Sequence, residues 1–293
     1  MGIGLAFLAM LAFASNILIT RYAVMRLSVE AGFFVVLAVN VVVSGAIYAV
    51  ELGLRSAPYS WNWRGAAWFL AGGVIGTFLA RRMLFETVRL VGPARASVFH
   101  SATPVFSLLA AWLLVNERLG AYEILLMTIV WTGLWLTHAP AVAAAAGAQL
   151  QKGMLIGVLT IAGFGFGNAI RGVAAREWSE PALGTFISSV AALMLQLAAT
   201  RDWGRIRDGF RRGLPGGIAL YVGCGTVTTF GTIFVTMAME RVEIALAALV
   251  VHTTPLVIFP YSVLVLRNRE NLNPRTALGA LIVLAGIVLL AVR

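Results

Sequence analysis

The chain has 293 residues, of which 60% are hydrophobic and only 12% are charged, and its mean hydropathy is +0.90. A water-soluble domain of this size carries roughly twice that share of charged residues, so we expect an integral membrane protein. The net charge of +10 comes from arginines scattered through short loops, which argues against a nucleic-acid surface and favours a role in setting membrane topology.

Ten apolar segments follow one another along the chain. Each is long enough to cross a hydrocarbon layer of ~30 Å as a helix of roughly 20 residues. The first segment lacks the basic residues that precede a secretion signal, so it is expected to be a span. The sequence predicts an all-α membrane protein with ten transmembrane helices, near residues 3–20, 31–50, 65–91, 94–115, 120–138, 153–175, 181–200, 214–239, 244–266 and 274–292.

Charge and cysteine content give two further constraints. Outside the predicted spans, thirteen Lys and Arg residues lie on one side of the membrane and six on the other. The positive-inside rule then puts both termini outside the cytoplasm, although five of the thirteen lie in the one loop at 201–212. Cys224 is the only cysteine, which excludes an intrachain disulfide and CxxC metal or redox chemistry.

The two halves of the chain resemble each other. A shift of 151 or 152 residues aligns Asn16 with Asn168 and Pro104 with Pro255. We interpret residues 1–138 as a first five-helix repeat, 139–152 as a low-complexity connector and 153–293 as a second five-helix repeat. Because each repeat has an odd number of spans, the second enters the membrane from the opposite face. Inverted repeats around a central cavity are typical of secondary transporters.

Similar polar clusters interrupt two apolar segments, VFHSATPVF at 98–106 and VVHTTPLV at 250–257. Each proline removes a helix donor and is expected to kink its span, and nearby hydroxyls can bond the freed carbonyls. The two histidines are costly in a membrane interior, where they bond a neighbouring helix or face a wet cavity. The candidates in these clusters are His100, Thr103, His252 and Thr253 for substrate binding, with Pro104 and Pro255 as kinks.

The segment at 65–91 carries charges that its counterpart at 214–239 lacks. Arg82 and Glu86 are four residues apart and can pair across one helical turn, which leaves Arg81 over. An unpaired guanidinium beside a cavity can bind a carboxylate through two hydrogen bonds, which makes Arg81 a candidate for substrate binding. The alternative is that the helix stops at Ala80 and these charges lie among lipid headgroups. Both interpretations stay open at this point.

Further candidates are amides, aromatic residues and glycines inside the spans. Asn16 and Asn168 share one depth of the first and sixth spans, where an amide bridges helices or contacts a ligand. The stretch GFGFGN predicts either a compliant place in the helix or close helix packing. The remaining candidates are Phe78, Phe85, Phe164 and Phe230 for an aromatic cavity wall, and Gly163, Gly165 and Gly167 as hinges.

Three segments carry a family resemblance: PARASVFHSATPVFSLLAAWLLVNERL at 93–119, AYEILLMTIVWTGLWL at 121–136 and LNPRTALGALIVLAGIVLLA at 272–291. They resemble the drug/metabolite transporter superfamily, and its EamA-type ten-helix exporters similar to bacterial aromatic amino acid exporters. The resemblance implies that spans 1, 3, 4, 6, 8 and 9 surround the cavity and that both termini are cytoplasmic, against the arginine count. Glu270 falls later than its counterpart Glu117, which departs from the family pattern.

These observations predict a secondary transporter in the inner (plasma) membrane that exports small metabolites by alternating access, with amino acids, including aromatic or hydrophobic ones, as the first substrate class. A carrier of organic anions or sugar conjugates is the alternative, followed by a lipid-modifying membrane enzyme that uses His100 and His252, and by a helical scaffold. Metal, nucleophile and nucleotide motifs are absent from the sequence, so we expect no enzyme, metal or cofactor. The expected partners are a small-molecule substrate and membrane lipid, without nucleic acid, and a monomer suffices.

Overall fold

The computed structural model describes residues 1–55, 60–91, 102–117 and 148–254, together with separate positions between 120 and 136 and between 257 and 289. All regular structure in these described residues is helical. The spans predicted at 120–138 and 274–292 lie largely outside them, so the number of ten helices stays a prediction.

The first half of the chain forms helices of unequal length. The elements are α1 (Gly2–Ala23), α2 (Val29–Leu54), α3 (Trp63–Gly72), the π-helical segment η1 (Gly73–Ala80), α4 (Arg81–Val91) and α6 (Thr103–Val115). Side chains fix two of the helix starts, because Ser28 Oγ accepts from Ala31 N at 3.4 Å and Asn62 Oδ1 accepts from Gly65 N at 3.0 Å. α3, η1 and α4 follow one another without a break, as one helical run.

The second half has α8 (Ala148–Glu177), α9 (Pro181–Ala199), α10 (Trp203–Arg212), α11 (Gly217–Met239) and α12 (Ile244–Val251). α8 begins inside the segment expected to be a connector. Among the described residues, five helices are long and apolar enough to cross a membrane: α1, α2, α9, α11 and the stretch Leu155–Glu177 of α8.

The connection between the predicted spans at 181–200 and 214–239 contains a helix, because Trp203–Arg212 form α10. Asp202 caps the helix by accepting from Arg205 N at 3.1 Å. Ile206 is buried on one side of the helix, and the Trp203 ring packs on Phe34 of α2 with 5.5 Å between the ring centroids. The arginines of this connection therefore lie on the polar side of an amphipathic helix.

Contacts between helices fix their directions. α1 and α11 are antiparallel, since Gly2 lies against Val242 just beyond the end of α11, and Thr20 near the end of α1 contacts Cys224. α2 runs parallel to α11, since Gly32 lies against Tyr221 and Asn40 bonds Thr229 further along both helices.

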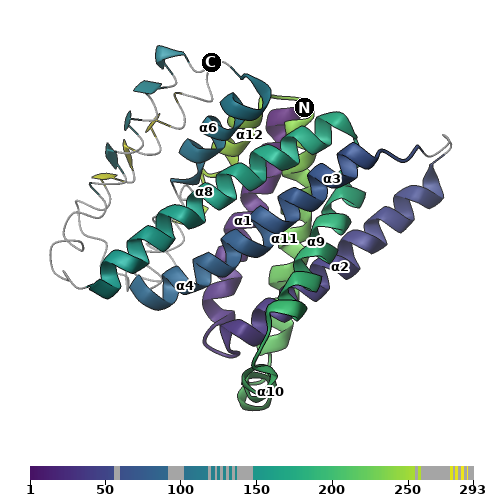
Figure 1. The fold of residues 1–293 in the computed structure, drawn as a ribbon, viewed down its shortest axis with the longest axis vertical. Helices are drawn as coiled ribbons and strands as arrows, with labels where there is room; N and C mark the ends of the chain where they lie inside the picture. Colours follow the sequence, from purple (N-terminus) through teal and green to yellow (C-terminus); the bar gives the residue numbers. More distant parts are fainter. Residues whose placement is uncertain are drawn as a thin grey trace.

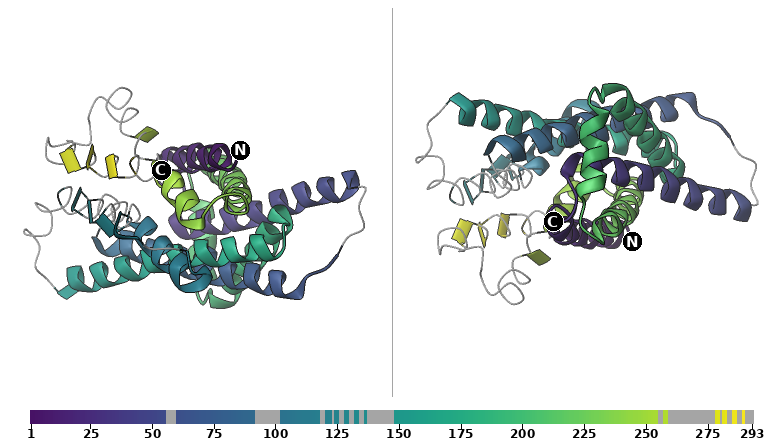
Figure 2. Two further views of the ribbon diagram at one scale, coloured as in Figure 1. Left: turned by 90° about the horizontal axis from the view of Figure 1, so that it is seen from above. Right: turned by 90° about the horizontal axis from the view of Figure 1, so that it is seen from below.

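The remaining directions follow in the same way. α9 is antiparallel to α2, and α8 is antiparallel to the run from α3 to α4, with Trp178 beside Gly65 and Gly163 beside Ala80. α6 runs parallel to α8, since Phe106 packs on Gly165 and Glu117 bonds Arg176. Helices at corresponding places in the two halves therefore run in opposite directions (Figure 1). The corresponding pairs are α1 with α8, α2 with α9, the run from α3 to α4 with α11, and α6 with α12. α11 and α12 lie between α1 and α8 (Figure 2).

α6 and α12 are short, and each has one end in the middle of the molecule. Phe106, in the first turns of α6, packs against Gly165 near the centre of the apolar stretch of α8. Pro104 lies in the first turn of α6, where its missing N–H is not needed. α6 begins at Thr103, and residues 92–101 before it lie outside the described residues, so the kink at Pro104 stays a prediction. In the second cluster α12 ends at Val251, and Pro255 lies outside the described residues.

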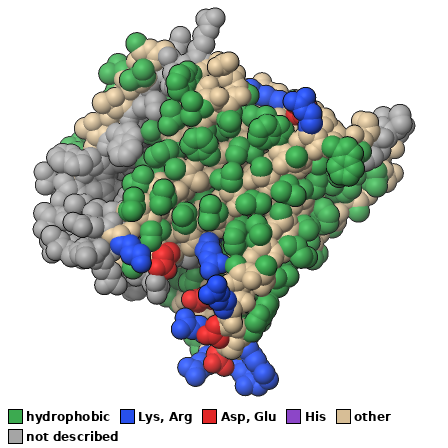
Figure 3. Space-filling view, in the orientation of Figure 1, with side chains coloured by type: hydrophobic (Ala, Val, Ile, Leu, Met, Phe, Trp, Pro, Cys, Tyr) green, Lys and Arg blue, Asp and Glu red, His purple; other side chains and the backbone are tan. Residues whose placement is uncertain are grey.

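The surface supports the membrane assignment. On the face shown in Figure 3, hydrophobic side chains cover the middle of the molecule, and most charged side chains gather at the two ends. One charged group surrounds α10, and we name this the α10 end. The other is the end at which α6, α8 and α11 finish and α9 and α12 begin, and we name it the Glu117 end.

Candidate functional site

The helical run from α3 to α4 decides where Arg81 lies. The run continues through Ala80 to Val91, so the alternative in which the helix stops at Ala80 is not what the structure has. Ala80 packs against Gly163 of α8, which lies within the apolar stretch Leu155–Glu177. Arg81 is therefore inside the helix bundle, and its side chain is half-buried.

η1 precedes Arg81 as eight residues of π-helix, a wider turn that often occurs at functional sites. Close backbone approach explains its glycines. A Cβ on Gly73 would lie 2.6 Å from the Ser188 backbone of α9. The widened turn thus packs against α9 on one side and α8 on the other, and it directs Thr77 toward α8.

Arg171 is the charged residue that the sequence analysis missed. Arg171 is 7% exposed and lies within the apolar stretch Leu155–Glu177 of α8, six residues before the end of the helix. Nη2 donates to Thr77 Oγ1 at 3.2 Å and Nη1 donates to Asn168 Oδ1 at 3.3 Å. Nε has no hydrogen-bond partner among the described residues. An arginine within an apolar span is itself the signal that could have identified it.

Arg81 and Arg171 act on each other. Arg81 follows Thr77 by one helical turn, so it lies next to the hydroxyl that Arg171 bonds. The two guanidinium groups are close enough for their like charges to repel each other. α8 and the junction of η1 and α4 therefore bound one polar region, while α1 meets α11 where Thr20 Oγ1 lies 3.4 Å from Cys224 Sγ. These helices correspond to the predicted spans 1, 3, 6 and 8.

The glycines predicted as hinges are close-packing positions in this conformation. α8 is continuous through Gly163, Gly165 and Gly167. A Cβ on Gly167 would lie 2.5 Å from Gly76 Cα, and one on Gly165 would lie 2.6 Å from the Phe106 backbone. The small residues let η1 and α6 approach α8, and a hinge function stays a prediction.

The residues of the two polar clusters lie at helix ends. Thr103 begins α6 and is fully buried. His252 follows the end of α12, is 7% exposed, and its backbone N–H bonds the carbonyls of Ala248 and Leu249. Thr253 Oγ1 donates to Val250 O at 2.7 Å, which fits the simpler explanation of a hydroxyl that satisfies a freed carbonyl. His100 lies outside the described residues.

The other predicted site residues are only partly brought together. Asn168 joins the Arg171 network, whereas Asn16 is half-buried in α1. Phe78 is half-buried and lies 5.9 Å below the guanidinium carbon of Arg82. Phe230 is 40% exposed and packs on Phe234. Phe164 is half-buried, and the side chain of Phe85 lies outside the description. A central cavity lined by these residues stays a prediction.

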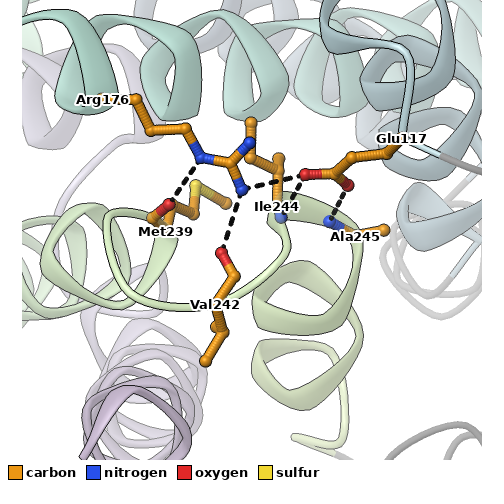
Figure 4. Close-up of polar contacts among 6 residues, drawn as sticks. All are labelled: Glu117, Arg176, Met239, Val242, Ile244 and Ala245. Atoms are coloured by element: carbon orange, nitrogen blue, oxygen red, sulfur yellow. Dashed lines mark hydrogen bonds and ion pairs between the residues drawn. The ribbon is translucent and has the colours of Figure 1, made fainter.

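A second polar arrangement ties four helices together at the Glu117 end (Figure 4). Asn116 closes α6 in the left-handed conformation, with φ of 53°, and Glu117 follows it. Its carboxylate accepts from the backbone N–H groups of Ile244 at 2.9 Å and Ala245 at 3.2 Å, at the start of α12. Arg176 of α8 pairs with Glu117 at 2.9 Å. Glu117 thus caps α12 with the charge that a helix N-terminus favours.

Arg176 extends this arrangement to α11. Its Nε donates to Met239 O at 3.1 Å and its Nη2 donates to Val242 O at 3.1 Å. Met239 is the last residue of α11 and Val242 lies three residues beyond it, so a cation that binds both carbonyls is well placed at this helix C-terminus. The sequence analysis noted Glu117 as a family feature but did not predict its partner, which is 59 residues away along the chain.

A second ion pair joins the two halves at the same end. Arg55 Nη2, just past α2, lies 2.6 Å from Glu180 Oε1 at the start of α9. The hydrogen bond to Glu180 raises the pKa of Arg55 above its usual value. Burial raises the pKa of the nearby Glu240 carboxyl, and this outweighs the hydrogen bond from Ser179 and the charge of Arg241, which lower it. In the part of the chain described, no three His, Cys, Asp or Glu side chains gather as a metal site would require.

Comparisons with known proteins fit this architecture. Among curated proteins, no relative matches the sequence. A solved crystal structure that is 16% identical matches with a TM-score of 0.69, over 98% of this chain and 96% of the other, which shows a shared fold. The model of the EamA-like transporter family matches twice, at residues 1–138 and 151–292, once in each half. These matches cover nearly the whole chain, and the protein belongs to the EamA-like transporter family, whose members are membrane transporters of small molecules.

Proposed function

We propose that this protein is a secondary transporter that exports small metabolites across the inner (plasma) membrane by alternating access. The observation that carries the proposal is the double family match to halves whose corresponding helices run in opposite directions. Two related halves of opposite direction can exchange conformations, and the exchange opens one central site first to one side of the membrane and then to the other.

Amino acids, including aromatic or hydrophobic ones, are the first substrate class of this proposal, as the family resemblance implies. Carriage of organic anions or sugar conjugates is the second candidate. Arg81 and Arg171 favour it, because two guanidinium groups in an apolar interior attract a negatively charged solute.

Counterflow in liposomes tests the proposal. Purified protein is reconstituted in vesicles that are loaded with one unlabelled compound, and the same compound is added outside in labelled form. Leucine, phenylalanine, glutamate and succinate form the first panel. A carrier accumulates the label transiently without changing the compound, whereas protein-free vesicles do not. Absence of counterflow for every compound counts against transport, and recovery of a chemically altered label indicates an enzyme.

A further inference from the structure

Two arginines from different halves of the chain face one region in the apolar interior. Arg171 of α8 is 7% exposed, and its Nη1 and Nη2 each donate one hydrogen bond to a neutral side chain, Asn168 and Thr77. Its buried Nε has no hydrogen-bond partner among the described residues. A guanidinium has five N–H donors, so these two bonds leave most of its hydrogen-bonding capacity unused.

Arg81 adds a second positive charge to the same region. Ala80, one residue before it, packs against Gly163 of α8, and Thr77, four residues before it, accepts a hydrogen bond from Arg171. Arg81 is therefore close enough to Arg171 for the two like charges to repel each other, and its side chain is half-buried. Glu86 follows Arg81 by five residues on the same helix, a spacing that turns it by about 140° to another face.

The two charges are left without an acid in the described part of the chain. Among the described residues, no carboxylate forms an ion pair with Arg81 or Arg171. Positive charges inside a membrane protein are costly, and they usually mark a substrate path or a site that a partner neutralises. A negatively charged ligand supplies the missing partner.

The C-terminal end of α12 bears on whether the ligand is an anion or a zwitterion. A helix C-terminus inside the membrane is the feature that would hold an ammonium group. At α12 three of the last four carbonyls already accept hydrogen bonds, since His252 N bonds Ala248 O and Leu249 O, and Thr253 Oγ1 bonds Val250 O. Among the described residues, the two arginines thus favour acidic groups, and this helix end offers little to an amine.

We propose that Arg81 and Arg171 form a two-armed binding site for a small organic anion of net negative charge, with one arm from each half of the transporter. Hydrogen bonds to Asn168 and Thr77 orient the Arg171 guanidinium, and Arg81 binds the ligand from α4. The inference rests on the proposed transport function and names its substrate class: carboxylates without a balancing amine, dicarboxylates and acidic amino acids, ahead of neutral amino acids.

Binding and transport are measured separately to test this site. Binding is read from the thermal shift that succinate or glutamate gives the detergent-purified protein, with phenylalanine as the zwitterionic probe. Counterflow of the same three compounds is measured in liposomes. The variants are Arg171→Gln, Arg171→Lys and Arg81→Gln. Arg64→Gln is the matched control, because Arg64 lies on the same helical run with its side chain 80% exposed.

We expect succinate and glutamate, but not phenylalanine, to stabilise the protein and to undergo counterflow. Loss of either guanidinium group should weaken anion binding on the order of 10- to 100-fold, since a charge-assisted hydrogen bond is lost. Arg171→Lys keeps the positive charge but loses the planar guanidinium with its paired donors. Its affinity for the anion should lie between that of wild type and that of Arg171→Gln. Arg64→Gln should bind and transport as wild type does.

Stability without ligand separates a binding site from a structural bridge. Arg171→Gln removes a buried, incompletely paired charge, so its melting temperature should be equal to or above that of wild type while anion binding falls. A lower melting temperature with unchanged anion binding by the folded variants overturns the site. Phenylalanine counterflow without anion binding overturns the substrate class but leaves the transporter proposal standing. Anion-dependent stabilisation without any counterflow supports the site and counts against transport.

Discussion

At the scale of single residues, the sequence identified only part of the candidate site. Arg81 and Asn168 could be predicted, because a charge and a recurring amide stand out within apolar segments. Arg171 was missed, since an alignment of the halves directs attention to paired residues, and its counterpart is an isoleucine. Its contact with Thr77 depends on packing between segments 94 residues apart, which no local pattern encodes.

Gly167 allows a sharp test of close packing at this scale. The change Gly167→Ala adds a methyl group 2.5 Å from Gly76 Cα, so α8 and η1 must move apart. We expect a loss of about 1–3 kcal/mol in the free energy of unfolding, the usual cost of overpacking. Gly53→Ala is the control, because a Cβ there meets nothing within 4 Å. Equal thermal unfolding of both variants in detergent would contradict the close contact.

Glu240 provides a pH-dependent prediction. Its pKa is raised in the folded protein above the ordinary value of 4.5, mainly by burial, so the folded state holds this proton more tightly than the unfolded state does. Its contribution to stability is therefore full below about pH 4.5 and is lost as the pH rises through the folded pKa.

The change Glu240→Gln removes this loss. The variant should be more stable than wild type at pH 7, and the difference should shrink as the pH is lowered toward 4, which serves as the internal control. Melting temperatures recorded across this range measure the effect. A gain that is the same at every pH would show that burial of the charge is not its cause.

At the scale of helices, most apolar segments were predicted with the right type, because long hydrophobic runs admit little besides helix in a membrane. Local detail was harder to predict where polar residues decide the structure. The prolines and hydroxyls at 98–106 suggested a kink, which stays a prediction because residues 92–101 before α6 lie outside the described residues. The arginine-rich connection at 201–212 was not predicted to contain a helix, whereas α10 forms at Trp203–Arg212 behind the Asp202 cap. A cluster of polar residues signals a change in the backbone, but it does not specify which change.

The cap on α12 can be tested at this scale. Glu117→Gln keeps one acceptor oxygen but loses the charge that binds Arg176 and two backbone N–H groups. We expect a loss of about 1–3 kcal/mol in the free energy of unfolding, reduced at high salt because the Arg176 side chain is 35% exposed. Glu243→Gln is the matched control, since that exposed side chain makes no cap bond one residue before α12. Similar losses from both variants would argue against the arrangement in Figure 4.

At the scale of the whole molecule, the duplication was visible because a shift of 151 or 152 residues aligns polar landmarks in both halves. The opposite helix directions agree with the prediction of an odd number of spans in each half, a counting argument that does not depend on exact helix ends. Ion pairs between the halves, such as Arg55 with Glu180, could not be predicted, since they depend on how the halves dock. In this conformation they hold the Glu117 end together.

The halves are alike in backbone and unlike in charge. A shift of 152 residues places Arg171 opposite Ile19 and Arg81 opposite Ile233, so neither cation has a charged twin. Under the proposed alternating access, the halves exchange conformations while each arginine stays on its own helix, so the site that faces one side of the membrane is not a copy of the site that faces the other. We therefore expect a different half-saturation concentration for the solute at each membrane face, while the final ratio of solute across the bilayer is set by the driving gradients alone.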